Sequence, residues 1–210
     1  MKIKHNEFVN FYNKDNKIFD RIFKDTKLLS TLVSKIKKES KNWEKFGYCE
    51  KTKCIIDPIK CVNKMTGHLF EIFCELFFKI EGPNPVVGVY NYNPAQEDDC
   101  GVDATGIGMN GMPLTVQCKF RSNTETELME CDLHQFAYQS QNRFNVGIDD
   151  INNMIVFTSA KGLHCFTEGN VFLNKVRTIG FKEIKNIVDN NPCFWLPLND
   201  YIKKTIKKSY

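Results

Sequence analysis

The chain has 210 residues, of which 42% are hydrophobic and 26% charged, and its formal net charge is +4. These values are typical of a globular protein that buries a core without disulfides, and they exclude a highly charged, disordered chain. The longest apolar stretch, residues 68–80, contains two glutamates and is shorter than the roughly 20 residues of a membrane-spanning helix, so we expect no membrane partner.

The nine cysteines are an odd number, are scattered along the chain and include no Cys-x-x-Cys pair. With no recognisable signal peptide ahead of them, they predict free thiols in a reducing, intracellular compartment. One alternative stays open. Cys49, Cys54, Cys61 and His68 match no common zinc-site spacing, but a loop could bring them together.

Residues 1–64 predict a helical, basic extension, because apolar residues recur near helical spacing and lysines crowd residues 27–45. Residues 65–210 form the predicted core, which ends in the basic tail 201–210. The acidic segments 96–103 and 124–132 lie between these basic flanks. Such a distribution suits a polyanion held over a metal site, and solvated helix faces are the alternative.

Hydrophobic periodicity then predicts the elements of the core in chain order. A buried helix begins with a cap at Thr66 and ends at Gly82. The elements predicted after it are strands at 85–93, 101–110 and 112–120, a helix at 130–144, a strand at 152–160, a short helix at 167–176, and a strand leading into a helix at 177–184. This order predicts an α/β fold: a mixed sheet flanked by helices, which begins as an antiparallel meander and continues through crossovers.

The third strand combines an apolar face with a polar one. Period-two alternation places Thr115, Gln117 and Lys119 together, and the preceding strand carries Asp103. A divalent metal site could use the Asp103 carboxylate and the Gln117 carbonyl oxygen, with Lys119 as a cation at the scissile phosphate. The alternative is an edge strand whose polar face is solvated.

The loop between these two strands decides whether they can share a metal. A two-residue turn at Asn110 and Gly111 would place Asp103 opposite Cys118, on the face away from Gln117. A three-residue loop with Gly111 in the left-handed conformation places Asp103 opposite Gln117. We therefore predict an odd-numbered loop, or an equivalent bulge, that brings Asp103 and Gln117 to one cation.

Three motifs together resemble the PD-(D/E)xK nuclease superfamily, and within it the Mrr-like restriction endonucleases. They are G-x-x-F-E at 67–71, D-x-G-V-D at 99–103 and V-Q-C-K at 116–119. The resemblance covers about residues 65–185. It extends to the strand 152–160, which is similar to a later core strand of that branch ending in a small hydroxyl pair, here Thr158 and Ser159.

The resemblance implies a restriction-endonuclease-like fold and a role for each site residue. Asp103 is the central metal ligand, Gln117 the second ligand, Lys119 the water-orienting and charge-stabilising residue, and Glu71 the helix-borne carboxylate that holds a metal-bound water. Glu75 competes with Glu71, because it lies four residues further on the same helical face. The sequence departs from the superfamily name at Val102, which replaces proline, and at Gln117, which replaces an acidic residue; both departures resemble the Mrr-like branch.

The function implied is a Mg²⁺-dependent DNA endonuclease, with Mn²⁺ as a substitute metal and DNA as the partner. A homodimer is considered, and the oligomeric state stays open. The rival hypotheses are a catalytically weak or inactive DNA-binding module on the same fold, and a nuclease domain of a larger replication or repair protein. Neither His134 nor His164 is expected to act as a general base, because metal and lysine suffice to form hydroxide.

Overall fold

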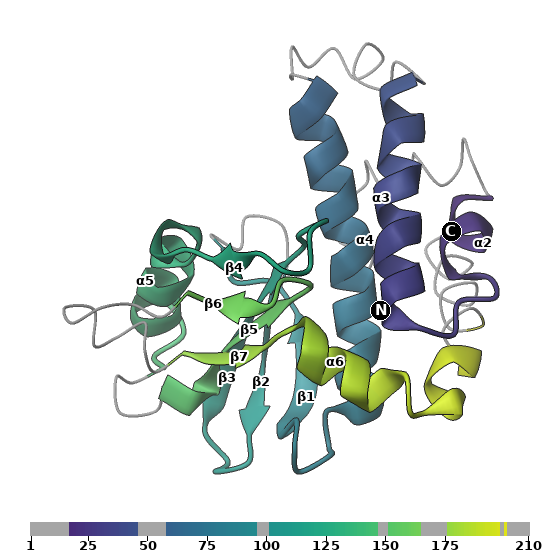
Figure 1. The fold of residues 1–210 in the computed structure, drawn as a ribbon. Coiled ribbons are helices and arrows are strands. Elements are labelled where there is room, and N and C mark those ends of the chain that lie inside the picture. The colour runs from purple at the N-terminus through teal and green to yellow at the C-terminus, as the bar shows by residue number, and fades with distance from the viewer. Residues whose placement is uncertain are drawn as a thin grey trace, which may run out of the picture. The chain divides into compact units, whose positions relative to one another are not determined.

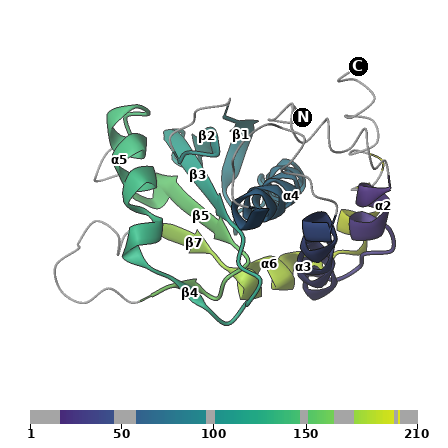
Figure 2. The same ribbon diagram turned by 90° about the horizontal axis from the view of Figure 1, so that it is seen from above.

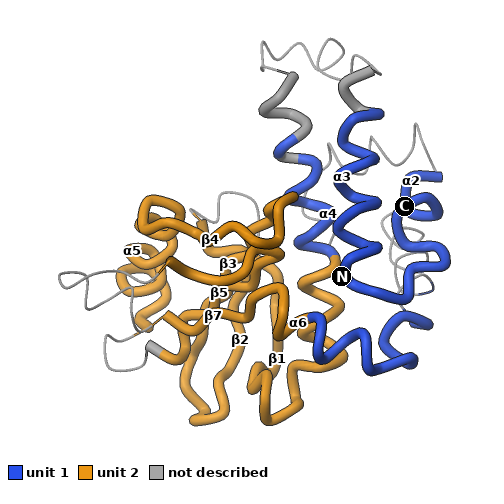
Figure 3. The backbone as a smooth tube through the Cα atoms, viewed as in Figure 1, with its two compact units in different colours: residues 1–72, 185–210 blue, residues 73–184 orange. Residues whose placement is uncertain are grey.

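We describe the chain from a computed structural model, which covers residues 17–45, 58–95, 101–146, 151–164, 176–197 and 200. Within these ranges the side chains at 43–45, 58–62, 64 and 151 are not described. The chain divides into two compact units, residues 1–72 with 185–210 and residues 73–184 (Figure 3). The boundaries fall inside two helices, and each unit is described by itself.

The first unit is helical. It contains α2 (Ile18–Phe23), α3 (Leu29–Lys45), the first part of α4 (Pro58–Glu81) and the end of α6 (Phe181–Val188). Helix α3 buries Leu29, Leu32 and Ile36 at helical spacing. Arg21 of α2 donates from Nε to Glu39 Oε2 of α3 at 3.0 Å, which joins the two helices through a carboxylate that is almost fully buried.

Helix α4 begins earlier than the sequence predicted. Its first residue is Pro58, whose fixed φ and missing N–H suit the first position of a helix. Thr66 is an interior residue, and its hydroxyl donates to the Asn63 carbonyl oxygen at 2.8 Å instead of capping the helix. The predicted end is confirmed, since α4 stops at Glu81 and a Cβ on Gly82 would lie 2.1 Å from the Phe78 carbonyl oxygen.

The second unit contains a five-stranded mixed sheet in the order β1-β2-β3-β5-β7 (Figure 1). Its strands are β1 (Val89–Pro94), β2 (Ala104–Gly108), β3 (Pro113–Lys119), β5 (Met154–Thr158) and β7 (Arg177–Ile179). The first three strands are antiparallel, and β3, β5 and β7 are parallel. The predicted meander followed by crossovers is therefore confirmed. The short parallel pair β4 (Glu127–Leu128) and β6 (Gly162–Leu163) was not predicted.

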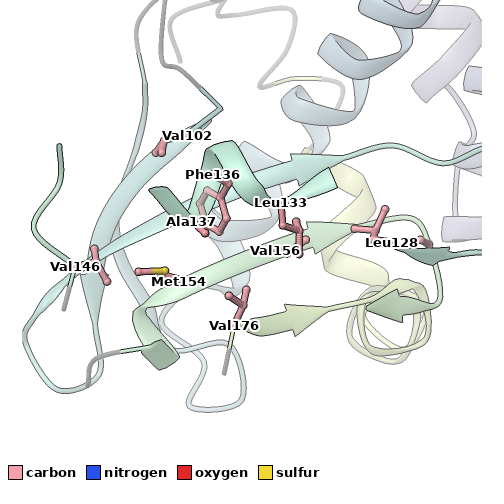
Figure 4. Packing of buried hydrophobic residues seen from close by; sticks show 10 residues of the cluster. Val102, Leu128, Leu133, Phe136, Ala137, Val146, Met154, Val156 and Val176 are labelled. Carbon is pink, nitrogen blue, oxygen red and sulfur yellow. The ribbon is translucent and has the colours of Figure 1, made fainter. Parts of the chain in front are cut away.

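Helices cover both faces of this sheet. Three aromatic rings of α4, on Phe73, Phe77 and Phe78, lie 5.0–6.0 Å from the Phe157 ring of β5. Helix α5 (His134–Asn142) packs on the other face, where Phe136 belongs to a buried cluster with residues of β5 (Figure 4). Figure 2 shows α5 on one side of the sheet and α4 on the other. Among the described residues no helix is both long and apolar enough to cross a membrane.

The loop between β2 and β3 has the predicted three residues. Gly108 N–H donates to the Met112 carbonyl oxygen at 2.9 Å, so Met109, Asn110 and Gly111 form the loop. Gly111 has a φ of 76°, which is the left-handed conformation that this loop requires. The register continues from Ile107 opposite Pro113 to Ala104 opposite Val116. The predicted odd-numbered loop is confirmed.

Replacing Gly111 tests this loop. Gly111→Val is expected to lower the free energy of unfolding by about 1–2 kcal/mol, because a left-handed residue with a Cβ is strained. A Cβ at this position would meet no atom within 4 Å, so the loss would come from the backbone alone. Gly111→Asn is the matched control and should lose much less, since asparagine tolerates this conformation. Urea unfolding measures both, and equal losses would contradict the explanation.

Candidate metal and phosphate site

Strand β3 is a central strand, and its polar face is mostly buried. It lies between β2 and β5, which rules out the alternative of an edge strand with a solvated polar face. Thr115 is fully buried and donates to Ser140 Oγ of α5 at 2.8 Å. Gln117 is 3% exposed, and only Lys119, at the strand end, is partly exposed. The sequence predicted the polar residues of this face correctly but not that α5 covers them.

Only one of the two polar atoms in the Gln117 amide has a hydrogen-bond partner among the described residues. Its Nε2 donates to the Gly101 carbonyl oxygen at 3.0 Å. Its Oε1 is buried and has no hydrogen-bond partner among the described residues. A buried acceptor without a partner costs about 1–3 kcal/mol, so such an atom normally serves a ligand. Gly101 is in the left-handed region with a φ of 91°, and a Cβ there would lie 3.4 Å from Gln135 Cγ of α5.

Asp103 lies where the β2–β3 ladder becomes irregular. Its N–H donates to the Val116 carbonyl oxygen at 2.9 Å although Ala104 is the residue opposite Val116. Two consecutive residues therefore face one residue of β3, which is a β-bulge. The Asp103 Oδ2 atom accepts a hydrogen bond of 2.6 Å from Cys118 N–H. The carboxylate thus replaces a backbone carbonyl as the partner of β3, which fixes its position with a charge-assisted bond.

The bulge changes what the register implies about side-chain direction. The sequence predicted the odd loop but not this irregularity, and a bulge rotates the residues that follow it along the strand. Gln117 lies beside Gly101 and Gln135 of α5. Asp103 lies beside Cys118, and its charge raises the pKa of Tyr92. The Tyr92 ring stacks on the Phe78 ring of α4 with 5.1 Å between the ring centroids. The predicted pairing of Asp103 with Gln117 is therefore wrong: the bulge sets Asp103 opposite Val116, and the two side chains have different neighbours.

Tyr92 belongs to the surroundings of Asp103. Its hydroxyl lies 3.7 Å from Cys74 Sγ of α4. Burial raises the Tyr92 pKa well above its usual value, and the nearby thiols of Cys74 and Cys118 and the Asp103 carboxylate raise it further. The side chain is therefore neutral at physiological pH. Cys74 and Cys118 are free thiols, as are Cys131 and Cys193.

Lys119 ends β3 and carries a cation with no side-chain partner in the described part of the chain. Its main chain is held by β5, because Thr158 Oγ1 donates to the Lys119 carbonyl oxygen at 2.8 Å and Ser159 N–H donates to it at 3.3 Å. Since Lys119 lies two residues beyond Gln117, the two side chains leave the strand on the same face. A partly exposed cation therefore stands beside a buried, unsatisfied oxygen.

The two helix carboxylates each have a cationic or polar partner. Glu71 belongs to the first unit, where its Oε2 lies 3.2 Å from His68 Nδ1. Glu75 belongs to the second unit, is 5% exposed and forms an ion pair with Lys79. Because the two residues belong to different units, their positions do not decide between them. The choice of Glu71 rests on the G-x-x-F-E spacing at 67–71.

The remaining sequence candidates divide into two groups. Cys49 and Cys54, two residues of the zinc-site alternative, lie outside the described residues. The two histidines that were set aside are exposed and pair with glutamates: His134 with Glu130 at 3.0 Å, and His164 with Glu127 at 2.8 Å. For Glu127, the hydrogen bond from His164 and then the contact with Lys161 lower the pKa.

The donor set fits a hard divalent cation in part. No group of three or more His, Cys, Asp or Glu side chains that could hold a metal occurs among the described residues. The predicted ligand set does not belong to this type of group, because it contains two carboxylates, those of Glu71 and Asp103, and the neutral amide of Gln117. Neutral carbonyl and carboxylate oxygens are the atoms that Mg²⁺ binds. Gln117 Oε1, buried and without a partner, is the atom that best fits this role.

Several residues of this region could not be found from the sequence. The hydroxyls of Thr158 and Ser159 were noted as a pair, but their contacts with β3 were not predicted. The alternation of Gln117 and Lys119 extends to Arg121, and this spacing is the sequence signal that could have identified Arg121. Tyr92 gave no signal, because its neighbours Cys74 and Cys118 are distant in the sequence.

Comparison of the chain with profiles of protein families, with curated proteins and with solved structures finds no match.

The raised pKa of Tyr92 predicts a loss of stability at alkaline pH. Below the pKa of an unfolded tyrosine, about 10, both states are protonated; above it only the unfolded chain loses the proton, so the stability falls until the folded-state pKa is reached. Tyr92→Phe should flatten this decline, measured by urea unfolding between about pH 9 and 11. The exposed Tyr138 provides the control, since Tyr138→Phe should leave the slope unchanged. Identical slopes for the two variants would contradict the assignment.

Proposed function

We propose that this protein is a Mg²⁺-dependent DNA endonuclease with a restriction-endonuclease-like fold, related to the Mrr-like branch of the PD-(D/E)xK superfamily. The observation that carries the proposal is Gln117 Oε1, a buried oxygen without a partner, which lies on the strand that also anchors Asp103 and Lys119. An unsatisfied amide in a central strand costs stability, and residues retained at such a cost commonly serve a ligand.

Each residue has a stated role in this proposal. Asp103 and Gln117 would hold the metal, and the motif resemblance, rather than the structure, assigns the helix carboxylate to Glu71. A bound Mg²⁺ would supply Lewis acidity and lower the pKa of a bound water. Cys118 N–H holds the Asp103 carboxylate in place, so that little reorganisation is needed when the substrate binds. The Lys119 ammonium stabilises the negative charge that develops on the phosphoryl oxygens during phosphodiester hydrolysis.

DNA is the proposed substrate because the chain carries exposed cations as well as this site. In the first unit, Lys37, Lys38 and Lys41 are exposed on α3. Lysines on a helix surface neutralise backbone phosphates and release counterions, which gives affinity without sequence preference. A chain that carries both exposed cations and a hydrolytic site fits a polyanionic substrate.

A DNA-binding module without catalysis is the second candidate. Two observations favour it: Asp103 Oδ2 already accepts a bond from Cys118 N–H, and Gln117 contributes no charge. A site with one fewer negative charge binds a divalent cation more weakly. Metal binding and strand cleavage therefore need separate tests.

Metal binding is expected to stabilise the protein. At a Mg²⁺ concentration of about a hundred times the dissociation constant, the gain is about 2.7 kcal/mol, seen as a rise in the thermal midpoint relative to EDTA. Gln117→Met should remove most of this rise, and Gln117→Glu should increase it, because an acidic ligand binds the cation more strongly. Gln139→Met on α5 is the matched control and should retain the rise.

Midpoints measured in EDTA show whether each variant folds. A rise in Gln117→Met equal to that of the wild type would remove Gln117 from the metal site.

Cleavage is expected to require Asp103 and Lys119. Asp103→Asn keeps an oxygen acceptor for Cys118 N–H but removes the charge, and Lys119→Met removes the cation; each should lower the cleavage rate by about 10²-fold or more. The assay is nicking of plasmid DNA with Mg²⁺, Mn²⁺ or EDTA, accompanied by branched and single-stranded substrates.

The control is Lys161→Met, which removes an exposed lysine paired with Glu127 and should cleave at nearly the wild-type rate. If the wild-type protein binds DNA but no metal supports cleavage, the binding-module candidate replaces the endonuclease.

A further inference from the structure

Two side-chain hydroxyls continue β3 beyond the end of its ladder. Ser159 Oγ accepts a bond of 2.7 Å from Arg121 N–H and donates one of 2.8 Å to the Arg121 carbonyl oxygen. Thr158 Oγ1 donates to the Lys119 carbonyl oxygen at 2.8 Å. Thr158 and Ser159 are both fully buried, so these bonds are shielded from competing water. The main chain is therefore fixed as far as Arg121.

Because the main chain is fixed, the side chains of Lys119 and Arg121 are aligned. Residues two apart on an extended strand leave it on the same side and about 6.6 Å apart. Arg121 thus continues the row that contains Gln117 and Lys119. The spacing is comparable to that between neighbouring phosphates of one DNA strand.

The Arg121 guanidinium is also held in place. Its Nη2 donates to Asp132 Oδ1 at 2.6 Å, and its Nη1 donates to the Phe120 carbonyl oxygen at 3.1 Å. Asp132 is fixed in turn, because its Oδ2 accepts a bond of 3.0 Å from Met129 N–H. The Arg121 side chain remains 37% exposed. A guanidinium oriented in this way needs little further ordering to bind a ligand.

Charge and donor count indicate an anionic ligand. Lys119 and Arg121 supply two positive charges against the single carboxylate of Asp132. Three of the five Arg121 N–H groups have no acceptor in the described part of the chain, and a planar guanidinium with several donors matches phosphate oxygens.

We propose that Arg121 binds a DNA backbone phosphate next to the one that Lys119 serves, and that Asp132 is a positioning residue that orients the guanidinium. This inference rests on the proposed function, because it assigns a substrate contact to the same site. It adds a phosphate subsite that lies beyond the metal-binding residues along β3.

Equilibrium binding of a labelled DNA duplex in EDTA tests the subsite without cleavage. Arg121→Met in the full chain should weaken binding and reduce the slope of log affinity against log salt by about 0.9, the value for one lost phosphate contact. Arg121→Lys should keep the slope and lose only a few-fold in affinity, because it retains the charge but not the planar fork. The matched control is Arg143→Met, which removes an exposed guanidinium at the C-terminal end of α5 and should leave the slope unchanged.

Asp132→Asn distinguishes positioning from charge alone. Removal of a negative charge by itself strengthens DNA binding, whereas loss of the orientation of Arg121 weakens it. We expect weaker binding, and tighter binding would overturn the positioning role. A slope that is unchanged in Arg121→Met, or that falls equally in Arg143→Met, would overturn the subsite.

The two proposals can fail separately. Wild-type cleavage with unchanged binding by Arg121→Met would leave the endonuclease and remove the subsite. An Arg121-dependent salt slope without cleavage would leave the subsite and remove the endonuclease. A wild-type protein that does not bind DNA in EDTA would overturn the subsite, and the plasmid assay with Mg²⁺ would then decide the endonuclease. Arg121→Lys provides the comparison if Arg121→Met fails to fold.

Discussion

The left-handed conformation of Gly111 sets the pairing on which the rest of the sheet depends. It closes a three-residue loop, and the loop fixes the register of β2 against β3 from Ile107 to Ala104. A loop one residue shorter would move every side chain of one strand to the opposite face. Because β3 is also fixed by its pairing with β5, this glycine determines which residues of β2 lie on each face of the sheet.

A second constraint follows where this pairing ends. The bulge at Asp103 breaks the ladder, and polar side chains replace the missing backbone bonds: the Asp103 carboxylate accepts from Cys118 N–H, and Gln117 donates to the Gly101 carbonyl oxygen. On the other side of β3, Ser159 does the same for Arg121. The polar residues of this region therefore complete the sheet and, in the proposed function, also contact the substrate. Gln117 Oε1 is the buried polar atom of β3 for which no partner is found among the described residues.

Local sequence signals predicted the strands, the odd loop and the mixed topology, because period-two alternation and turn glycines act over a few residues. The predicted start of α4 was wrong, because a threonine that could cap a helix can also form a hydrogen bond within one, as Thr66 does. The burial of Gln117 could not be predicted, since it depends on the packing of α5 over β3. The bulge at Asp103 has no sequence signature, and the bonds of Ser159 to Arg121 join residues 38 positions apart.

That separation along the chain has a consequence for the order of folding. The β2–β3 hairpin closes over three residues, whereas β3 and β5 are separated along the chain by the segment that contains α5. Local contacts form faster than contacts between distant segments, because loop closure costs less entropy. We expect the hairpin to pair Asp103 with β3 early, and the row of Lys119 and Arg121 to be anchored late. A folding intermediate that lacks β5 would thus contain half of the polar site, with the main chain at Lys119 and Arg121 not yet anchored.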